Sequence, residues 1–419
     1  MNNFTHKPQA KNTTNINKQE NYFFSQPHQP FFLAGVVWAI IVMLIFMMSY
    51  KMMLKGDINT VISPTMFHAY SLTFIVFTQF FIGFLYTTFS RFCQSEPVKK
   101  PYYVRTFFLF QVGSLLMVLG FFLSKTLMLA GMGILLLGQL VFLYMLQSIF
   151  SSAQAKIKDD PFWILTSIYL GTAAHAVWII EVILDLSIFA LPFAFNLYLI
   201  FMTFSIAQRM VPFFSHSLEP KRAGFVVTVF IALILKSFAD IFNKEIFEAM
   251  ISLLLGLYIF FEVIRWKLSF FQAPNILKIL HVALFWMPAS LILGSFFQLG
   301  EIILQTGFAF ADVHMLALGF LTTIIIGFGT RVTLGHSGQP PHADSNTLKL
   351  FYLTQVLVVF RLLYSLVFGF DLPLFWLFSE ELSTQQTASA IFDISLGLWL
   401  VLFIFWGLKF GPVLVLRKK

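Results

Sequence analysis

The chain is poor in cysteine and in charge. Cys93 is the only cysteine among 419 residues, and Asp, Glu, Lys and Arg together make up 11% of the sequence. A lone thiol excludes an intramolecular disulfide and a cysteine-bound cluster such as an iron–sulfur centre. So few charged residues also leave no stretch polar enough to form a soluble domain of any size.

Apolar residues take the place of charge and make up 58% of the chain. They gather in runs of about 20 residues, the length at which a helix crosses the hydrocarbon core of a bilayer. We therefore predict an all-α polytopic membrane protein with twelve transmembrane helices. The predicted spans are 31–53, 66–90, 106–124, 128–150, 161–184, 189–208, 223–242, 246–264, 277–299, 309–330, 348–370 and 388–408.

The basic residues are distributed unevenly around these spans. We expect residues 1–30 to form a disordered cytoplasmic tail, 31–410 the twelve-helix transmembrane domain and 411–419 a basic cytoplasmic tail. Of the 27 Lys and Arg residues, 21 lie in or within three residues of the two tails and alternate connections, and 4 lie in or within three residues of the other connections. The positive-inside rule then places both termini in the cytoplasm of a bacterial inner membrane. The lipid bilayer is the expected partner, and nucleic-acid binding is improbable.

One apolar span carries a histidine near each end, His314 and His336. Their separation of 22 residues corresponds to about 33 Å along a helix, close to the thickness of a bilayer core. Imidazole is costly to place in hydrocarbon, so a histidine there usually serves as a ligand, a proton relay or a buried hydrogen-bonding group. The span is therefore predicted to carry a functional site.

The topology sorts the histidines by depth. His68, His175 and His314 are expected in the periplasmic half, while His28, His216, His281, His336 and His342 are expected near the cytoplasmic face. Two imidazoles on facing helices can fill both axial positions of a haem, and three can hold copper or zinc. We predict His68, His175 and His314 as metal ligands, with His68 and His314 the best-matched haem pair. The alternative for each is an imidazole bonded to a carbonyl or a carboxylate.

A second set of side chains is expected at the cytoplasmic face. Arg209 and Arg331 there have the planar guanidinium that bonds both oxygens of a carboxylate, such as a haem propionate. We predict that His281 and His336 join them in cofactor binding, with His216 nearby; contact with lipid headgroups is the alternative. The carboxylates Glu181, Asp185 and Asp312 either orient the periplasmic histidines or form a solvated rim.

Three spans end in an arginine at similar intervals. Arg91, Arg209 and Arg331 close spans 2, 6 and 10, at separations of 118 and 122 residues (209 − 91 and 331 − 209). Either arginines simply mark cytoplasmic ends, or the chain consists of three four-helix repeats. The second arrangement resembles the main subunits of haem–copper oxidases in span count and histidine placement. A His-His pair on span 7 and a His-x-His on span 10 are missing, so we predict no oxygen-reducing centre of that type.

Several motifs resemble those of the NnrS family, membrane proteins associated with haem, copper and the bacterial response to nitric oxide. The matching residues, in chain order, are Phe31-Phe32-Leu33, Arg209-Met210-Val211-Pro212-Phe213-Phe214-Ser215, Leu280-His281, His314, Gly319 and Thr330-Arg331-Val332-Thr333-Leu334-Gly335-His336-Ser337-Gly338. Span 2 departs from the family's His-Ala-His-Glu-Met, because it reads His68-Ala69-Tyr70-Ser71-Leu72. A metal site built on the family's second histidine or its glutamate therefore cannot be carried over to this chain.

The resemblance implies a haem protein, with copper as a second cofactor, that acts in nitric oxide metabolism or the nitrosative-stress response. Its implied partners are nitric oxide or another small diatomic molecule and an electron donor such as a quinone. If the chain is an enzyme, it is expected to be a membrane oxidoreductase. The alternative is a transporter or channel in which the intramembrane histidines form a proton or substrate path.

The charge count generates a direct test of topology. Reporter fusions after residues 60 and 187 are expected to report the periplasm, whereas fusions after residues 97 and 340 are expected to report the cytoplasm. Alkaline phosphatase and green fluorescent protein activities of the same truncations measure this. Exchanged signals at two of the four positions would contradict the topology and the depth of the histidines.

Overall fold

The computed structural model describes residues 22–57, 59–217, 219–372 and 383–416, and all of their regular secondary structure is helical. A 3₁₀ turn, η1 (Tyr22–Phe24), precedes the first long helix. Nine spans within these residues are unbroken α-helices: α1 (His28–Leu54), α4 (Lys100–Leu123), α5 (Lys125–Ser151), α6 (Asp159–Leu184), α9 (Phe225–Ile241), α10 (Glu245–Arg265), α11 (Asn275–Leu304), α14 (Ser345–Phe370) and α15 (Thr384–Val415).

The other three spans are composite, because a π-helical segment lies between two α-helical ones. Span 2 consists of α2 (Pro64–Tyr70), η2 (Ser71–Phe77) and α3 (Thr78–Cys93). Span 6 consists of α7 (Ala190–Phe193), η3 (Ala194–Ile200) and α8 (Phe201–Phe214). Span 10 consists of α12 (Ala311–His314), η4 (Met315–Thr322) and α13 (Thr323–His336).

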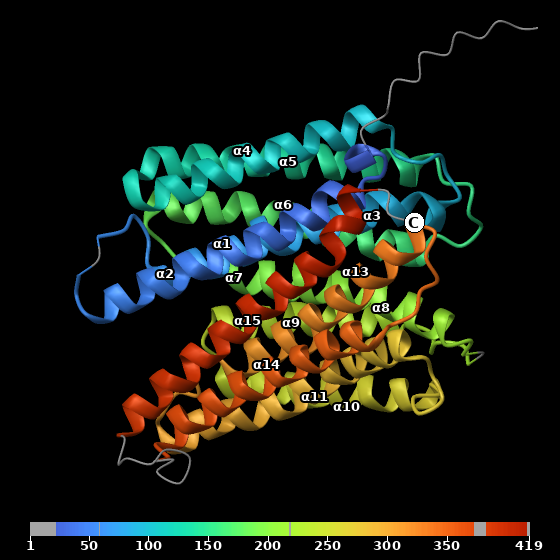
Figure 1. The fold of residues 1–419 in the computed structure, drawn as a ribbon. Coiled ribbons are helices and arrows are strands. Elements are labelled where there is room, and N and C mark those ends of the chain that lie inside the picture. Colours follow the sequence, from blue (N-terminus) through green and yellow to red (C-terminus); the bar gives the residue numbers. More distant parts are fainter. Residues whose placement is uncertain (1–21, 58, 218, 373–382, 417–419) are drawn as a thin grey trace, which may run out of the picture.

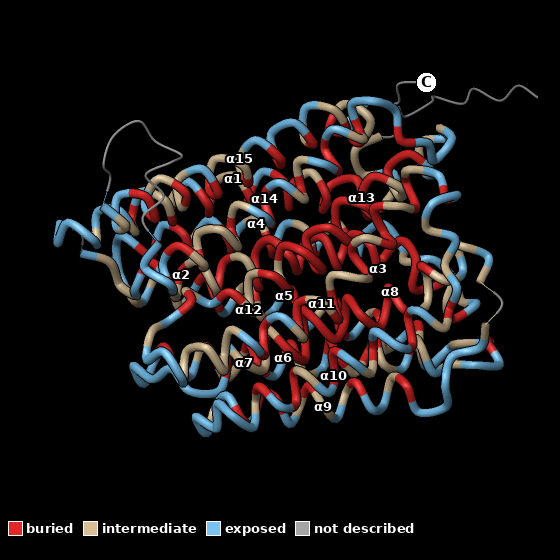
Figure 2. Tube along the Cα trace, turned by 90° about the horizontal axis from the view of Figure 1, so that it is seen from below, coloured by how far each residue is buried: buried red, intermediate tan, exposed pale blue. Residues whose placement is uncertain are grey.

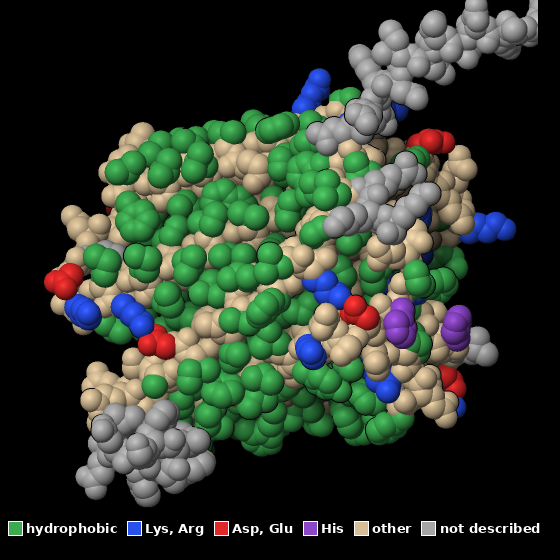
Figure 3. Space-filling model, viewed as in Figure 1, with side chains coloured by type: hydrophobic (Ala, Val, Ile, Leu, Met, Phe, Trp, Pro, Cys, Tyr) green, Lys and Arg blue, Asp and Glu red, His purple; other side chains and the backbone are tan. Residues whose placement is uncertain are grey.

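The predicted all-α polytopic membrane fold with twelve transmembrane helices is confirmed. Eleven of the described helical spans are long and apolar enough to cross a membrane, and the twelfth, α9, has 17 residues. The spans run side by side, and the described ends of the chain lie at the same end of the bundle (Figure 1). Apolar side chains cover the flank of the molecule, whereas charged ones gather mainly toward its two ends (Figure 3).

Spans 2, 6 and 10 form the centre of the bundle (Figure 2). Their apolar windows are 94, 78 and 83% buried, against 39–61% in the other eight apolar spans. Segment η3 contacts both η2 and η4, and α3 contacts α13. The central position agrees with the repeat hypothesis. The three repeats themselves, and the likeness to haem–copper oxidases, stay predictions.

Threonine side chains satisfy the backbone of two of the π segments. A π turn shifts the hydrogen-bond ladder and leaves a carbonyl without its usual amide. The hydroxyl of Thr78 donates to the carbonyl of Thr73, and those of Thr322 and Thr323 donate to the carbonyls of Ala317 and Leu318, each five residues earlier. In hydrocarbon these carbonyls have no water, so the hydroxyls make the wider helix tolerable.

The two ends of the chain differ from the predicted boundaries. Helix α1 begins at His28, three residues early, because the side-chain carbonyl of Gln29 accepts hydrogen bonds from Ser25 and from the amide of Gln26 and closes the preceding turn. Helix α15 continues to Val415, beyond the predicted end at 410. The predicted tails at residues 1–21 and 417–419 lie outside the described residues, and their cytoplasmic location stays a prediction.

Glycines bring α4 and α5 into close contact. A Cβ added to Gly131 would lie 2.2 Å from the backbone nitrogen of Met117, and one added to Gly120 would lie 2.1 Å from that of Met128. Both clashes involve backbone atoms, so no side-chain rotation relieves them. The outer hairpin of α4 and α5 therefore depends on these small residues for its packing.

We expect Gly131→Leu to destabilise the protein by at least about 2 kcal/mol, because the two helices must move apart. Gly133→Leu is the matched control on the same helix, since a Cβ there meets nothing within 4 Å. Unfolding in mixed detergent micelles measures the difference. Equal stability of the two variants would contradict the close packing.

Candidate functional site

The structure brings His68 and His314 together at the end of the bundle predicted to face the periplasm. Their ring centroids lie 6.5 Å apart, and the ring planes are 16° from parallel. The Ser63 cap and Pro64 start α2 so that His68 lies one turn into the helix, where it stacks on Phe46 at 4.2 Å. No hydrogen bond to the His68 ring occurs within the described residues.

The backbone of its own helix orients the His314 ring. Nδ1 of His314 lies 2.8 Å from the carbonyl oxygen of Phe310 and 3.0 Å from a guanidinium nitrogen of Arg361. One nitrogen cannot donate to the carbonyl and accept from the guanidinium at once, so the tautomer decides between the two contacts. When Nδ1 donates to the carbonyl, Nε2 carries the free lone pair that a metal requires.

Arg361 is the member of the site that the sequence-based prediction missed. Its side chain on α14 is buried, and it donates to Ser365 at 2.7 Å and to the carbonyl of Ala309 at 2.5 Å. Within the described residues no carboxylate lies within ion-pair distance of it. A buried guanidinium without a counter-ion is costly, so this position suits an external anion. A charged residue inside an apolar span was the available signal.

The distance between the His68 and His314 rings fits a metal ion held between two imidazole nitrogens. A metal about 2 Å from each ring nitrogen places two imidazole centroids roughly 6 Å apart when the nitrogens are trans to each other. The observed 6.5 Å matches this arrangement, which is that of the two axial ligands of a haem. Arg361 beside the pair provides a partner for a propionate carboxylate. The residues present therefore fit a haem.

His175, predicted as a third metal ligand, lies in a different environment. Its Nε2 is 2.7 Å from the hydroxyl of Tyr70 and its Nδ1 is 2.8 Å from the side-chain oxygen of Gln139. The ring also stacks on Phe74 at 4.0 Å. Within the described residues no group of three or more His, Cys, Asp or Glu side chains is placed to hold a metal ion. Ligation by His175 stays a prediction that would require one of these hydrogen bonds to break.

The residues of the predicted cytoplasmic set contact different protein groups, and their gathering around one cofactor stays a prediction. Arg209 pairs with Asp160 at 2.8 Å and lies over the ring of Phe92. His281 is buried and its Nε2 lies 2.6 Å from the hydroxyl of Ser215. The exposed His216 makes no hydrogen bond or ion pair with Arg209 or His281 within the described residues. Arg331 and His336 lie on span 10 and have other neighbours.

A comparison with protein families identifies the fold's relatives. A family model described as NnrS protein matches residues 22–418. The chain belongs to the NnrS family. A comparison with curated proteins found no match.

The NnrS-like motifs, scattered in sequence, contact one another at the end of the bundle predicted to face the cytoplasm. Ser215 of the middle motif bonds to His281, as described above. The ring of Phe214, one residue earlier, lies 4.0 Å from the guanidinium of Arg331 in the span 10 signature. Thr330 of that signature accepts a hydrogen bond from the indole of Trp406 at 3.0 Å. These motif residues hold α8, α11, α13 and α15 together, which gives them a structural role.

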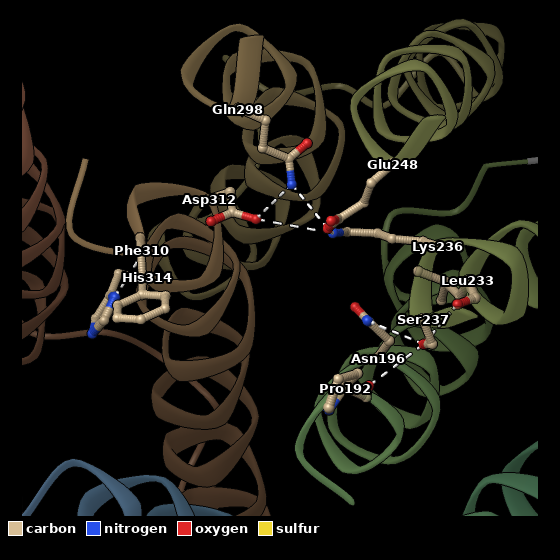
Figure 4. Close-up of polar contacts among 10 residues, drawn as sticks. All are labelled: Pro192, Asn196, Leu233, Lys236, Ser237, Glu248, Gln298, Phe310, Asp312 and His314. Carbon is tan, nitrogen blue, oxygen red and sulfur yellow. Dashed lines mark hydrogen bonds and ion pairs between the residues drawn. The ribbon is translucent and has the colours of Figure 1, made fainter. Parts of the chain in front are cut away.

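The three carboxylates considered as orienting groups bond elsewhere. Glu181 accepts hydrogen bonds from the backbone amides of residues 188–190, and Asp185 pairs with Lys125 at 2.7 Å. Asp312 points away from His314, because two residues along a helix correspond to about 200° of rotation. Figure 4 shows the Asp312 carboxylate turned toward Gln298 and Lys236.

Asp312 belongs to a buried polar cluster between α9, α10, α11 and α12. Lys236 forms an ion pair with Glu248 and lies 3.9 Å from Asp312, while the amide of Gln298 donates to both carboxylates at 2.9 and 3.1 Å (Figure 4). The Lys236 side chain is 6% exposed. The single ammonium of Lys236 thus faces two carboxylates, with Asp240 as a further acidic neighbour, and the cluster joins the short α9 to the bundle.

We expect Lys236→Met to destabilise the NnrS-family chain by about 3 kcal/mol, because it leaves the partly buried carboxylates of Glu248 and Asp312 without their cation. Adding Glu248→Gln to that variant is expected to restore part of the loss. Lys125→Met is the control, since its pair with Asp185 is exposed and worth at most about 1 kcal/mol. Unfolding in mixed micelles that gives equal values for Lys236→Met and Lys125→Met would refute the stabilising role of the cluster.

Proposed function

We propose that this NnrS-family chain is an inner-membrane haem protein of the nitric oxide response, and that His68 and His314 would hold the haem iron. Family membership supports the physiological role and a multi-pass membrane protein. The observation that carries the haem assignment is the pair of imidazoles 6.5 Å apart beside an uncompensated Arg361. Both termini lie in the cytoplasm in this proposal, and the haem lies near the periplasmic face.

Each residue of the site has a distinct task. His68 on α2 and His314 on α12 would hold the iron, and donation from Nδ1 of His314 to the carbonyl of Phe310 would leave Nε2 free for it. Arg361 binds a propionate carboxylate, and Phe46 supports the face of the His68 ring. A bound haem supplies an iron centre for electron exchange and for nitric oxide chemistry. Electrons would come from a quinone or another membrane donor.

The visible absorption spectrum of protein purified from membranes tests the proposal. We expect a Soret band in the wild type and its loss or shift in His68→Ala and in His314→Ala, because each removes an axial ligand. His342→Ala, which changes an exposed histidine at the other end of the bundle, is the control and should keep the wild-type spectrum.

Arg361 gives a second arm of the same experiment. Arg361→Gln keeps both ligands, so the Soret band should stay, while haem retention falls about tenfold or more through the lost propionate contact. Arg361→Lys keeps the charge and should lose less. A wild type without any Soret band would favour the transporter alternative. Unchanged spectra in both histidine variants would exclude this ligand pair.

A further inference from the structure

A small cavity lies inside the bundle, between α1, α3, α8 and α13. The centre of a water-sized atom can occupy about 30 Å³ of it. Phe32 lines it from α1, Phe80 and Phe84 from α3, Ile206 from α8 and Ile325 from α13. Each of these side chains is at most 7% exposed, and three of the four helices belong to the buried central spans (Figure 2). The walls of the cavity are therefore part of the core of the bundle.

Aromatic rings that contact one another keep this cavity open. The ring centroids of Phe32 and Phe80 lie 5.8 Å apart, and those of Phe84 and Phe328 lie 5.6 Å apart. Helix α3 packs directly on the Phe32 ring, because a Cβ added to Gly83 would lie 3.0 Å from it. Rigid rings held in this way cannot turn into the empty space without losing their own packing. The cavity is therefore a stable feature of the fold.

The lining of the cavity offers almost nothing to water. Thr203 has the one polar side chain among the described residues that line it, and its hydroxyl already donates to the carbonyl of Leu199 at 2.7 Å. A buried water needs roughly two to four polar partners, whereas an apolar cavity stays dry and takes up small apolar molecules. Water, ions and polar metabolites are therefore poor occupants.

The size of the cavity limits the occupant further. One water-sized molecule needs about 10–15 Å³ of such space, so the observed volume holds roughly two atoms. An acyl chain, a quinone or a haem is much larger. Ile324, which also lines the cavity, is 10 residues beyond His314 (324 − 314), or about 15 Å along the span. The cavity is therefore separate from the candidate haem site.

We propose that this cavity is a binding site for an uncharged diatomic gas molecule. Such a molecule has two atoms, no charge and little need for hydrogen bonds, which matches both the volume and the lining. It also dissolves in the hydrocarbon around the bundle, so it needs no aqueous channel to reach the site. The inference rests on the proposed function for the identity of the gas, since nitric oxide belongs to this class, but it does not depend on a bound haem.

Xenon is the probe for the test, because this apolar atom enters dry cavities of small size. Crystals of the full-length protein, with its haem content as isolated, are pressurised with xenon. We expect an anomalous peak between Phe84 and Ile325 in the wild type. Ile325→Phe fills the space and should lose the peak, whereas Ile325→Ala enlarges the cavity and should strengthen it. Carbon monoxide at equal pressure should weaken the wild-type peak, because a diatomic gas competes for the same space.

Two further variants make the outcomes distinguishable. Ile326→Val changes a buried neighbour outside the lining and should keep the xenon peak. His68→Ala should keep it whatever happens to the visible spectrum, so failure of the haem assignment and failure of the gas site give different results. A wild type without the peak, or a peak that persists in Ile325→Phe, overturns the site. Ordered water or an acyl chain in the cavity, or a peak that carbon monoxide leaves unchanged, overturns it as well.

Discussion

A polar side chain inside a bilayer has no water to bond, and this constraint organises the whole molecule. Most buried polar groups here form hydrogen bonds or ion pairs with other protein groups. His175 bonds to Tyr70 and Gln139, and Lys236 is neutralised by Glu248 and Asp312. Such closed groups explain stability and need no ligand. Buried polar groups without a protein partner are therefore candidates for ligand binding, because an external ligand can satisfy them.

The His68–His314 site at one end of the bundle has groups that no protein partner satisfies. Within the described residues the His68 ring makes no hydrogen bond and no carboxylate lies within ion-pair distance of Arg361, which together suit an anionic macrocycle with a central metal. Nδ1 of His28 and Nδ1 of His281 are also buried without a hydrogen-bond partner in this part of the chain. Span 10 carries His314, and the span is central and deeply buried.

Depth along the membrane could be predicted from the sequence, whereas lateral position could not. Hydropathy located the twelve spans, and histidine depth brought His68 and His314 together correctly. Tyr70 illustrates what failed: its bond to His175 depends on which helices are neighbours, and a single sequence carries no such information. Asp312 does not orient the ring of His314, because two residues of helix turn its side chain away from that histidine. His28 was expected near the cytoplasmic face, but composition assigned residues 1–30 to a tail, whereas His28 is the first residue of α1.

The central claim is that His68 and His314 together hold a haem iron in this protein. A cryo-EM map of protein purified from membranes tests this claim most directly. The account predicts haem density between His68 and His314, with Arg361 beside a propionate. Imidazoles of His68 and His314 in direct contact in haem-replete protein, or haem density bound elsewhere in the bundle, would contradict it.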